Sequence, residues 1–258
     1  MNLDTASLAI LLPALIAGLL VTATHVPLGM QVLERGIVFI DLAVAQVAGL
    51  GVILADALGW EPTGAAVQVA ALVAALAAAL LLTFTERRWP AIQEAVIGVV
   101  YVLASSAAIL LLAKNPHGGE HLKDLLVGQI LWVDPKRLPL VALVYAAILA
   151  LWFGLRERLG RIGFYVLFAC AVTVAVQLVG LFLVFITLVV PSLATYYSRR
   201  RRTLKGYVIG SLGYAAGLVA SLVTDLPSGS MIVCSMVLVG AVAAMIFKRG
   251  GARYNRGR

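Results

Sequence analysis

Long apolar runs, separated by short polar stretches, recur along the whole chain. Most have close to the ~20 residues with which an α-helix crosses a hydrocarbon core of about 30 Å, so they predict an all-α, polytopic membrane helical bundle. His25 lies just before Pro27, at the end of the first predicted crossing, and is interpreted as an interfacial residue. The nine predicted crossings are residues 7–26, 37–58, 63–84, 92–113, 138–155, 164–179, 181–196, 207–224 and 230–247.

The segment from Phe164 to Tyr196 decides between eight and nine crossings. As a single helix its 33 residues would be about 50 Å long, well beyond the thickness of the hydrocarbon core. A break near Gly180 gives two short helices that fit a bilayer. We therefore expect nine crossings, with the chain ends on opposite sides, whereas eight would leave both ends on one side.

Composition agrees with a membrane protein that forms a single transmembrane domain over residues 1–258. The chain is 62% hydrophobic and 12% charged, with a mean hydropathy of +1.02, whereas about a quarter of the residues in soluble domains are charged. Cys170 and Cys234 lie inside apolar runs, so they are interpreted as core residues and not as a disulfide or metal cluster. The amino-terminal stretch has neither a basic start nor a cleavage site, which predicts a retained first helix.

The net charge of +8 is explained by membrane topology. With nine crossings, 16 of the 20 basic residues fall on one side, and the other side has four basic residues against seven acidic ones. The 16 are Arg35, Arg87, Arg88, Arg156, Arg158, Arg161, Arg199, Arg200, Arg201, Arg202, Lys205, Lys248, Arg249, Arg253, Arg256 and Arg258. The positive-inside rule then places the N-terminus outside and the C-terminus in the cytoplasm. No nucleic-acid partner is expected.

Four polar residues within the predicted crossings are candidates for a translocation path. A carboxylate inside a membrane span is costly, and Asp41 lies about one turn into the second crossing, with Gln46 further along the same helix. Asp41 is either held at the interface by a backbone group or an arginine, or it is a ligand or gate for a cation. Glu94 opens the fourth crossing, where the helix dipole favours a carboxylate. Gln177, close to Gly180, lines a cavity or bonds a neighbouring helix.

The longest polar connection, residues 114–137, falls on the outer side in this topology. His117, Glu120 and His121 in its PHGGEH sequence are either ligands for a divalent metal or ordinary polar loop residues. Residues 122–133 are too short and too apolar for a crossing or a free loop, so they predict a short interfacial or re-entrant helix.

Catalytic motifs are missing from the sequence. It contains no Gly-x-Ser-x-Gly, no His-Glu-x-x-His and no phosphate-binding glycine loop with its lysine. The chain is therefore not expected to be an enzyme, and a pump that consumes ATP would need its ATPase on another chain.

Five sequence blocks, collinear over nearly the whole chain, resemble the permease subunit of metal-type ABC importers, the branch that carries zinc, manganese or iron. The blocks are residues 34–51, QEAVIGVVY at 93–101, DLLVGQILWV at 124–133, VGLFLVFITLVVPSLATYYS at 179–198, and DLPSGSMIV at 225–233. The last two are also similar to the permeases of vitamin B12 and siderophore importers.

The resemblance implies a homodimer with a central path in the lipid of a bacterial inner membrane. Its partners would be two cytoplasmic ATPase subunits and an extracytoplasmic metal-binding protein. No cofactor is expected, because the metal ion is the cargo. The coupling segment of the family maps onto residues 191–206, where the candidate contacts to the ATPase are Pro191, Ser192, Tyr196, Tyr197, Arg199, Arg200, Arg201, Arg202 and Lys205.

One position departs from the family pattern. Members commonly place a histidine four residues after the aspartate that matches Asp41, and here that residue is Ala45. The imidazoles of the outer loop favour zinc as the cargo, with manganese second and iron third. A self-contained secondary cation transporter and an intramembrane enzyme stay open as alternative functions.

Overall fold

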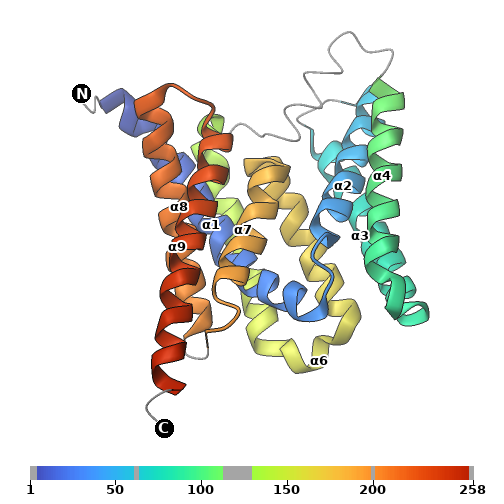
Figure 1. Cartoon of the computed structure of the whole chain (residues 1–258). Helices are drawn as coiled ribbons and strands as arrows, with labels where there is room; N and C mark the ends of the chain where they lie inside the picture. The colour runs from blue at the N-terminus through green and yellow to red at the C-terminus, as the bar shows by residue number, and fades with distance from the viewer. Residues whose placement is uncertain (1–4, 61–63, 113–129, 199–200, 256–258) are drawn as a thin grey trace. The chain divides into compact units, whose positions relative to one another are not determined.

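The computed structural model describes residues 5–60, 64–112, 130–198 and 201–255, which form helices joined by short turns (Figure 1). In order, the helices are α1 (Thr5–Arg35), α2 (Ile40–Ala57), α3 (Ala65–Arg88), η1 (Pro90–Ile92), α4 (Gln93–Leu112), η2 (Ile130–Trp132), η3 (Pro135–Arg137), α6 (Leu138–Val179), α7 (Leu181–Ala194), α8 (Arg202–Thr224) and α9 (Ser228–Asn255). No strand occurs among these residues, and the predicted all-α class is confirmed.

Eight stretches of the described residues are long and apolar enough to cross a membrane, and α7 is a shorter apolar helix of 14 residues. Together they correspond to the nine predicted segments. Gly180 separates α6 from α7 with φ 88°, a conformation that glycine adopts at little cost. The predicted break near Gly180 is therefore confirmed.

A second glycine divides α6 into two crossings. Gly160 has the non-helical angles φ 56° and ψ −154°, and it lies near the start of the second of the two crossings, Pro135–Leu155 and Arg158–Val179. The predicted pair of crossings at 138–155 and 164–179 is confirmed, although the second starts earlier than expected.

The predicted end of the first helix at Val26 is wrong, because α1 continues through Pro27 to Arg35. A proline inside a helix has no N–H, so it leaves the carbonyl group four residues earlier without its usual partner. That carbonyl belongs to Ala23, and the hydroxyl of Tyr207 in α8 donates a hydrogen bond to it at 3.2 Å. The backbone is thus satisfied without water, as a membrane interior requires.

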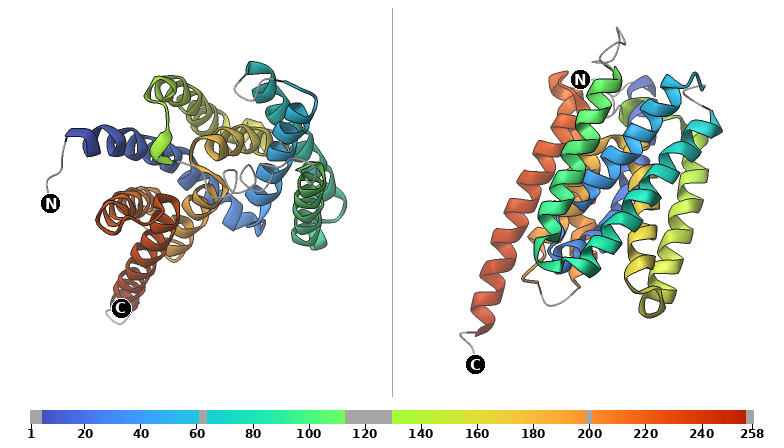
Figure 2. Two further views of the ribbon diagram at one scale, coloured as in Figure 1. Left: turned by 90° about the horizontal axis from the view of Figure 1, so that it is seen from above. Right: turned by 90° about the vertical axis from the view of Figure 1, so that its right-hand side faces the viewer.

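The described residues belong to two compact units, the first within Met1–Arg35, Val127–Tyr145 and Leu178–Arg258, and the second within Gly36–Leu126 and Ala146–Gln177. In the first unit α8 packs along α9, and α1 packs against α7 and α8 (Figure 2). In the second unit α2 packs against both α3 and α4 (Figure 1). The single transmembrane domain inferred from the sequence stays a prediction.

Small residues allow these helices to approach closely, which is how membrane helices commonly associate. Gly217 of α8 lies against the backbone of Ile232 in α9, and Gly29 of α1 lies against the carbonyl group of Leu188 in α7. Gly51 of α2 meets the small side chains of α3 in the same way. A Cβ atom at any of these glycines would force the helices apart.

We expect Gly217→Ala to lower the free energy of unfolding by about 1–3 kcal/mol, because the new methyl group overlaps backbone that cannot rotate away. The measurement is the thermal or denaturant midpoint of the purified protein in detergent. Gly98→Ala in α4 is the matched control, since open space surrounds that glycine. Equal midpoints for the two variants would show that α8 and α9 do not pack as described.

Candidate functional site

Asp41 lies in the first turn of α2, and its side chain is completely buried. Its neighbours Ile40, Ala43 and Val44 are buried as well, so its surroundings are largely apolar. Within the described part of the chain neither carboxylate oxygen has a hydrogen-bond partner. Burial of a carboxylate with so little compensation is costly, so Asp41 stays a candidate functional residue.

Glu94, in the first turn of α4, connects this helix to the start of α2. Its Oε1 accepts a hydrogen bond from the N–H of Phe39 at 3.2 Å, and its Oε2 is buried without a hydrogen bond among the described residues. Phe39 is the N-cap residue of α2, so Glu94 accepts from the N-cap N–H as the glutamate of a capping box does, although it comes from another helix. The sequence predicts Glu94 at the N-terminus of α4, and the structure shows that it also binds the N-terminus of α2.

Gln93 fixes the position of Glu94, a role that the sequence analysis did not anticipate. Its Nε2 donates to the carbonyl oxygen of Leu82 at 3.0 Å, and its Oε1 accepts from the hydroxyl of Thr85 at 3.0 Å. Gln93 is buried, and both partners lie near the end of α3. The start of α4 is therefore held against the end of α3, and the adjoining carboxylate has a defined place.

Asp41 and Glu94 together form an acidic pair within the second unit. Glu94 binds the N–H of Phe39, two residues before Asp41 in the chain, so both carboxylates lie at the start of α2. Like charges repel strongly where little water screens them. A cation bound between the two carboxylates would remove this repulsion and satisfy the oxygens that have no other partner.

The other two predicted path residues are Gln46 and Gln177. Gln46 is nearly buried in α2, but five residues of helix turn its side chain about 140° away from that of Asp41. Ala45, where the resembling family has histidine, is buried and offers no ligand. Gln177 is exposed on α6, three residues before Gly180. The path roles of both glutamines stay predictions.

The predicted outer metal ligands His117, Glu120 and His121 lie outside the described residues, as does most of the predicted re-entrant helix, so both stay predictions. Across the residues that the structure does describe, no three or more His, Cys, Asp or Glu side chains gather closely enough to hold a metal ion. Asp41 and Glu94 thus provide two ligating residues from one chain, whereas transition metals in proteins commonly have four to six ligands.

The predicted coupling segment joins α7 to α8. Pro191 and Ser192 are buried in the last turns of α7, whereas Tyr196 and Tyr197 are exposed in the turn that follows. The rings of the two tyrosines meet edge to face, with their centroids 5.1 Å apart. This part of the segment therefore presents an aromatic surface beside a buried anchor.

Basic residues at the start of α8 attach this segment to its surroundings. The guanidinium of Arg202 donates to Oε1 of Glu34 at 2.7 Å and lies 5.6 Å from the ring centroid of Tyr196. Because Glu34 belongs to the last turn of α1, this ion pair ties α1 to the coupling segment. Lys205 donates to the hydroxyl of Ser198 at 2.6 Å.

Arg201 precedes α8, and its side chain is exposed. Arg199 and Arg200, also predicted to contact the ATPase, lie outside the described residues.

His25 is buried in α1 and does not lie at its end, so its predicted interfacial position is wrong. Its Nδ1 is 3.0 Å from both the carbonyl oxygen of Val21 and the hydroxyl of Thr24, and Nε2 has no hydrogen bond within the described residues. The misplacement follows from Pro27, which does not end the helix. The apolar residues that continue with helical spacing beyond that proline were the signal in the sequence.

Comparisons with known proteins agree with this architecture. The sequence profile of the ABC 3 transport family matches residues 7–162 and 139–248. The chain superimposes on a structure of PsaBC from Streptococcus pneumoniae in complex with Fab with a TM-score of 0.73 and 21% identity, covering 91% of this chain and 90% of that one. It also superimposes on an inward-facing metal-chelate type ABC transporter with a TM-score of 0.57 and 14% identity, covering 96% and 80%. No curated protein matches the sequence.

The chain belongs to the ABC 3 transport family. It is a multi-pass membrane protein with the helical fold of ABC transporter permeases, and its own part in the transporter is that of the membrane component.

We expect Gln93→Leu to lower the free energy of unfolding by about 1–3 kcal/mol, because it leaves the hydroxyl of Thr85 and the carbonyl group of Leu82 buried without this partner. The measurement is the unfolding midpoint in detergent. Gln68→Leu is the control, since Gln68 is exposed on α3. If both substitutions shift the midpoint equally, the bonds of Gln93 do not hold α3 and α4 together.

Proposed function

We propose that this chain is the permease subunit of an ABC importer that moves a divalent transition metal ion into the cytoplasm. Two copies form the path in a bacterial inner membrane, separate ATPase subunits bind on the cytoplasmic side, and an extracytoplasmic protein delivers the metal. Membership of the ABC 3 transport family and the likeness to a transporter described as metal-chelate type support this proposal. The N-terminus then lies outside, in agreement with the distribution of basic residues.

The observation that carries the proposal is the completely buried carboxylate of Asp41 at the start of α2, the helix end where Glu94 also binds. A neutral cargo would gain nothing from a buried carboxylate whose two oxygens have no hydrogen bond among the described residues. A divalent cation gains two oxygen ligands and neutralises both charges. If the path lies between two copies of the chain, the second copy contributes its own Asp41 and Glu94. The number of ligating residues then rises to about four, which is within the range that these metals use.

The metal itself is inferred from ligand chemistry. The imidazoles of His117 and His121 favour zinc, which takes nitrogen ligands readily, and we place zinc first. The oxygen ligands of the acidic pair also suit manganese, which comes second, ahead of iron. Ala45 removes an imidazole from the membrane part of the path, so ions that depend less on nitrogen can pass.

We propose that residues 191–206 transmit movement of the ATPase subunits to the membrane helices. The exposed aromatic pair Tyr196 and Tyr197 and the basic residues that follow can seat in a groove of another protein. The ion pair between Arg202 and Glu34 would pass the motion on to α1. Such rigid transfer between packed elements is a common form of conformational switching.

Asp41→Ala is expected to reduce metal uptake to background while the protein still inserts and assembles, because the cation loses a ligand that the path requires. Uptake of radioactive zinc and manganese is measured in cells that express the importer, and assembly is followed by co-purification of the ATPase. Asp56→Ala, at the other end of the same helix, is the matched control and should transport normally. Normal uptake by Asp41→Ala would remove this residue from the path.

Replacement of Arg199, Arg200, Arg201 and Arg202 by glutamate is expected to uncouple ATP hydrolysis from transport, since like charges then repel the surface that the arginines bind. The readouts are ATPase stimulation by the loaded binding protein and metal uptake in proteoliposomes. Glutamate at Lys136 and Arg137, at the start of α6, reverses charge at another helix end and serves as the control.

The same substitutions also break the ion pair between Arg202 and Glu34. A further variant distinguishes the loss of this ion pair from the loss of coupling. Adding Glu34→Arg restores an oppositely charged pair between α1 and α8 and should restore the unfolding midpoint without restoring coupling. If stimulated ATP hydrolysis and uptake persist after the charge reversal, residues 191–206 are not the coupling segment.

A further inference from the structure

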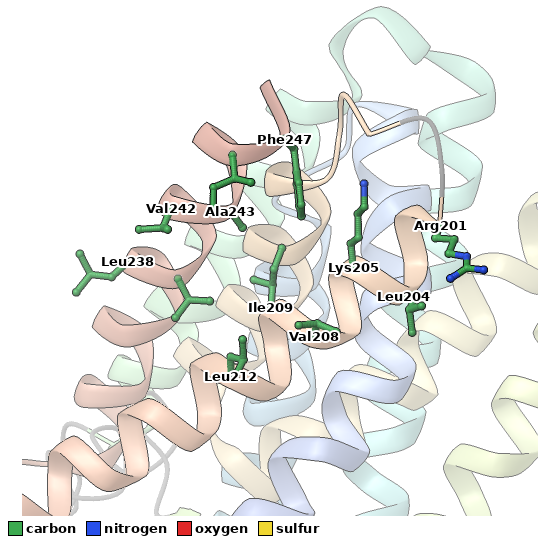
Figure 3. A pocket seen from close by; sticks show the side chains of 12 residues that line it. Arg201, Leu204, Lys205, Val208, Ile209, Leu212, Leu238, Val242, Ala243 and Phe247 are labelled. Carbon is green, nitrogen blue, oxygen red and sulfur yellow. The ribbon is translucent and has the colours of Figure 1, made fainter. Parts of the chain in front are cut away.

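A groove of about 600 Å³ runs between α8 and α9 in the first unit (Figure 3). Ten of the twelve residues that line it are apolar, and the remaining two are Arg201 and Lys205. Val208 and Leu212 of α8 and Val242 of α9 are each half exposed or slightly more along its walls. Both helices belong to crossings, so this concave apolar surface lies at the depth of lipid acyl chains.

The two basic residues lie at one end of the groove. Arg201 immediately precedes α8, and Lys205 is one helical turn further on. The ammonium group of Lys205 lies 4.4 Å from the ring centroid of Phe247, the last residue of the crossing in α9. Figure 3 shows this ring beside the lysine side chain. The positive end of the groove therefore coincides with the end of both crossings.

The length of the groove corresponds to one leaflet. From Arg201 to Leu212, α8 rises about 16 Å at 1.5 Å per residue, and half of a ~30 Å hydrocarbon core is about 15 Å. A phosphate group at Arg201 and Lys205 would place an attached acyl chain along the apolar walls. The chain would reach the middle of the bilayer where the groove ends.

We propose that this groove is a specific site for one acidic phospholipid of the leaflet next to the basic end of α8. Its phosphate accepts hydrogen bonds from Arg201 and Lys205, and one acyl chain lies between α8 and α9. A lipid with net negative charge fits the two cations better than a zwitterionic lipid, whose own ammonium group opposes them. The inference requires that the chain crosses a membrane, and it does not depend on the metal. Arg201 and Lys205 also belong to the proposed coupling segment, so the test uses this chain without its ATPase.

A second copy of the chain fits this surface less well. In a membrane dimer the two-fold axis runs along the bilayer normal, so both copies have the same orientation. If the two grooves faced each other, Arg201 and Lys205 would lie opposite the same residues of the other copy. Like charges placed together in this way are unfavourable, whereas a lipid phosphate neutralises them.

The test is native mass spectrometry of the full chain in detergent, titrated with phosphatidylglycerol or phosphatidylcholine. We expect the wild type to bind one phosphatidylglycerol more tightly than phosphatidylcholine. In Arg201→Ala/Lys205→Ala the affinity for phosphatidylglycerol should fall about 25-fold, since each basic residue near a membrane surface contributes about fivefold. Binding of phosphatidylcholine should change little.

A second variant tests the apolar walls, and two others serve as controls. Val242→Trp fills the groove and should weaken both lipids. Leu103→Trp on α4, where the leucine is 68% exposed, and Lys136→Ala/Arg137→Ala should leave both affinities unchanged. Arg201→Lys/Lys205→Arg keeps the charges and should keep the preference for phosphatidylglycerol, which separates loss of charge from loss of folding.

Three results would overturn the proposal. Equal affinity of the wild type for the two lipids, or unchanged phosphatidylglycerol binding in the double alanine variant, would show that the basic end does not select the headgroup. If Val242→Trp instead converts a dimer into monomers and leaves lipid binding unchanged, the groove is an interface between copies of this chain.

Discussion

The structure depends on one constraint, which is that polar groups inside a hydrocarbon layer must find their partners within the protein. The buried threonines show how this is met locally. The hydroxyls of Thr22, Thr83 and Thr173 each donate to the carbonyl oxygen four residues earlier in the same helix, at 2.7–2.8 Å. At Pro27 of α1 the hydroxyl of Tyr207 from α8 donates to the carbonyl group that the proline leaves without its helical partner. The helix therefore continues through the proline.

Buried polar atoms that have no hydrogen-bond partner in such a structure therefore indicate a candidate functional position. Asp41 is completely buried and its oxygens have no side-chain partner among the described residues, although nearby glutamine and threonine side chains are paired. Its position is fixed indirectly, because Gln93 holds the start of α4 and Glu94 holds the start of α2. A rigid frame around an unsatisfied carboxylate is the arrangement expected of a cation site and not of a packing defect.

Much of the architecture could be predicted from hydropathy and chain length. The apolar helices, the break at Gly180 and the division of the long apolar region from residue 138 to 179 follow from the thickness of a bilayer and from the properties of glycine. The extension of α1 could not be predicted, because the tyrosine that compensates for Pro27 lies 184 residues from the carbonyl it bonds. The sequence indicates Asp41 because a carboxylate inside a crossing is costly, whereas the hydrogen bond of Glu94 to Phe39 joins residues 55 apart in the chain and could not be predicted.

The central claim, ATP-driven import of a divalent transition metal, is tested most directly in sealed proteoliposomes. They contain this chain and its ATPase subunits, with the metal-loaded binding protein and radioactive zinc outside. The account predicts that metal accumulates only when ATP is enclosed with the ATPase and that a proton gradient alone drives no uptake. Accumulation in vesicles that contain this chain alone, driven by a proton gradient without ATP, would contradict the account and identify a self-contained secondary transporter.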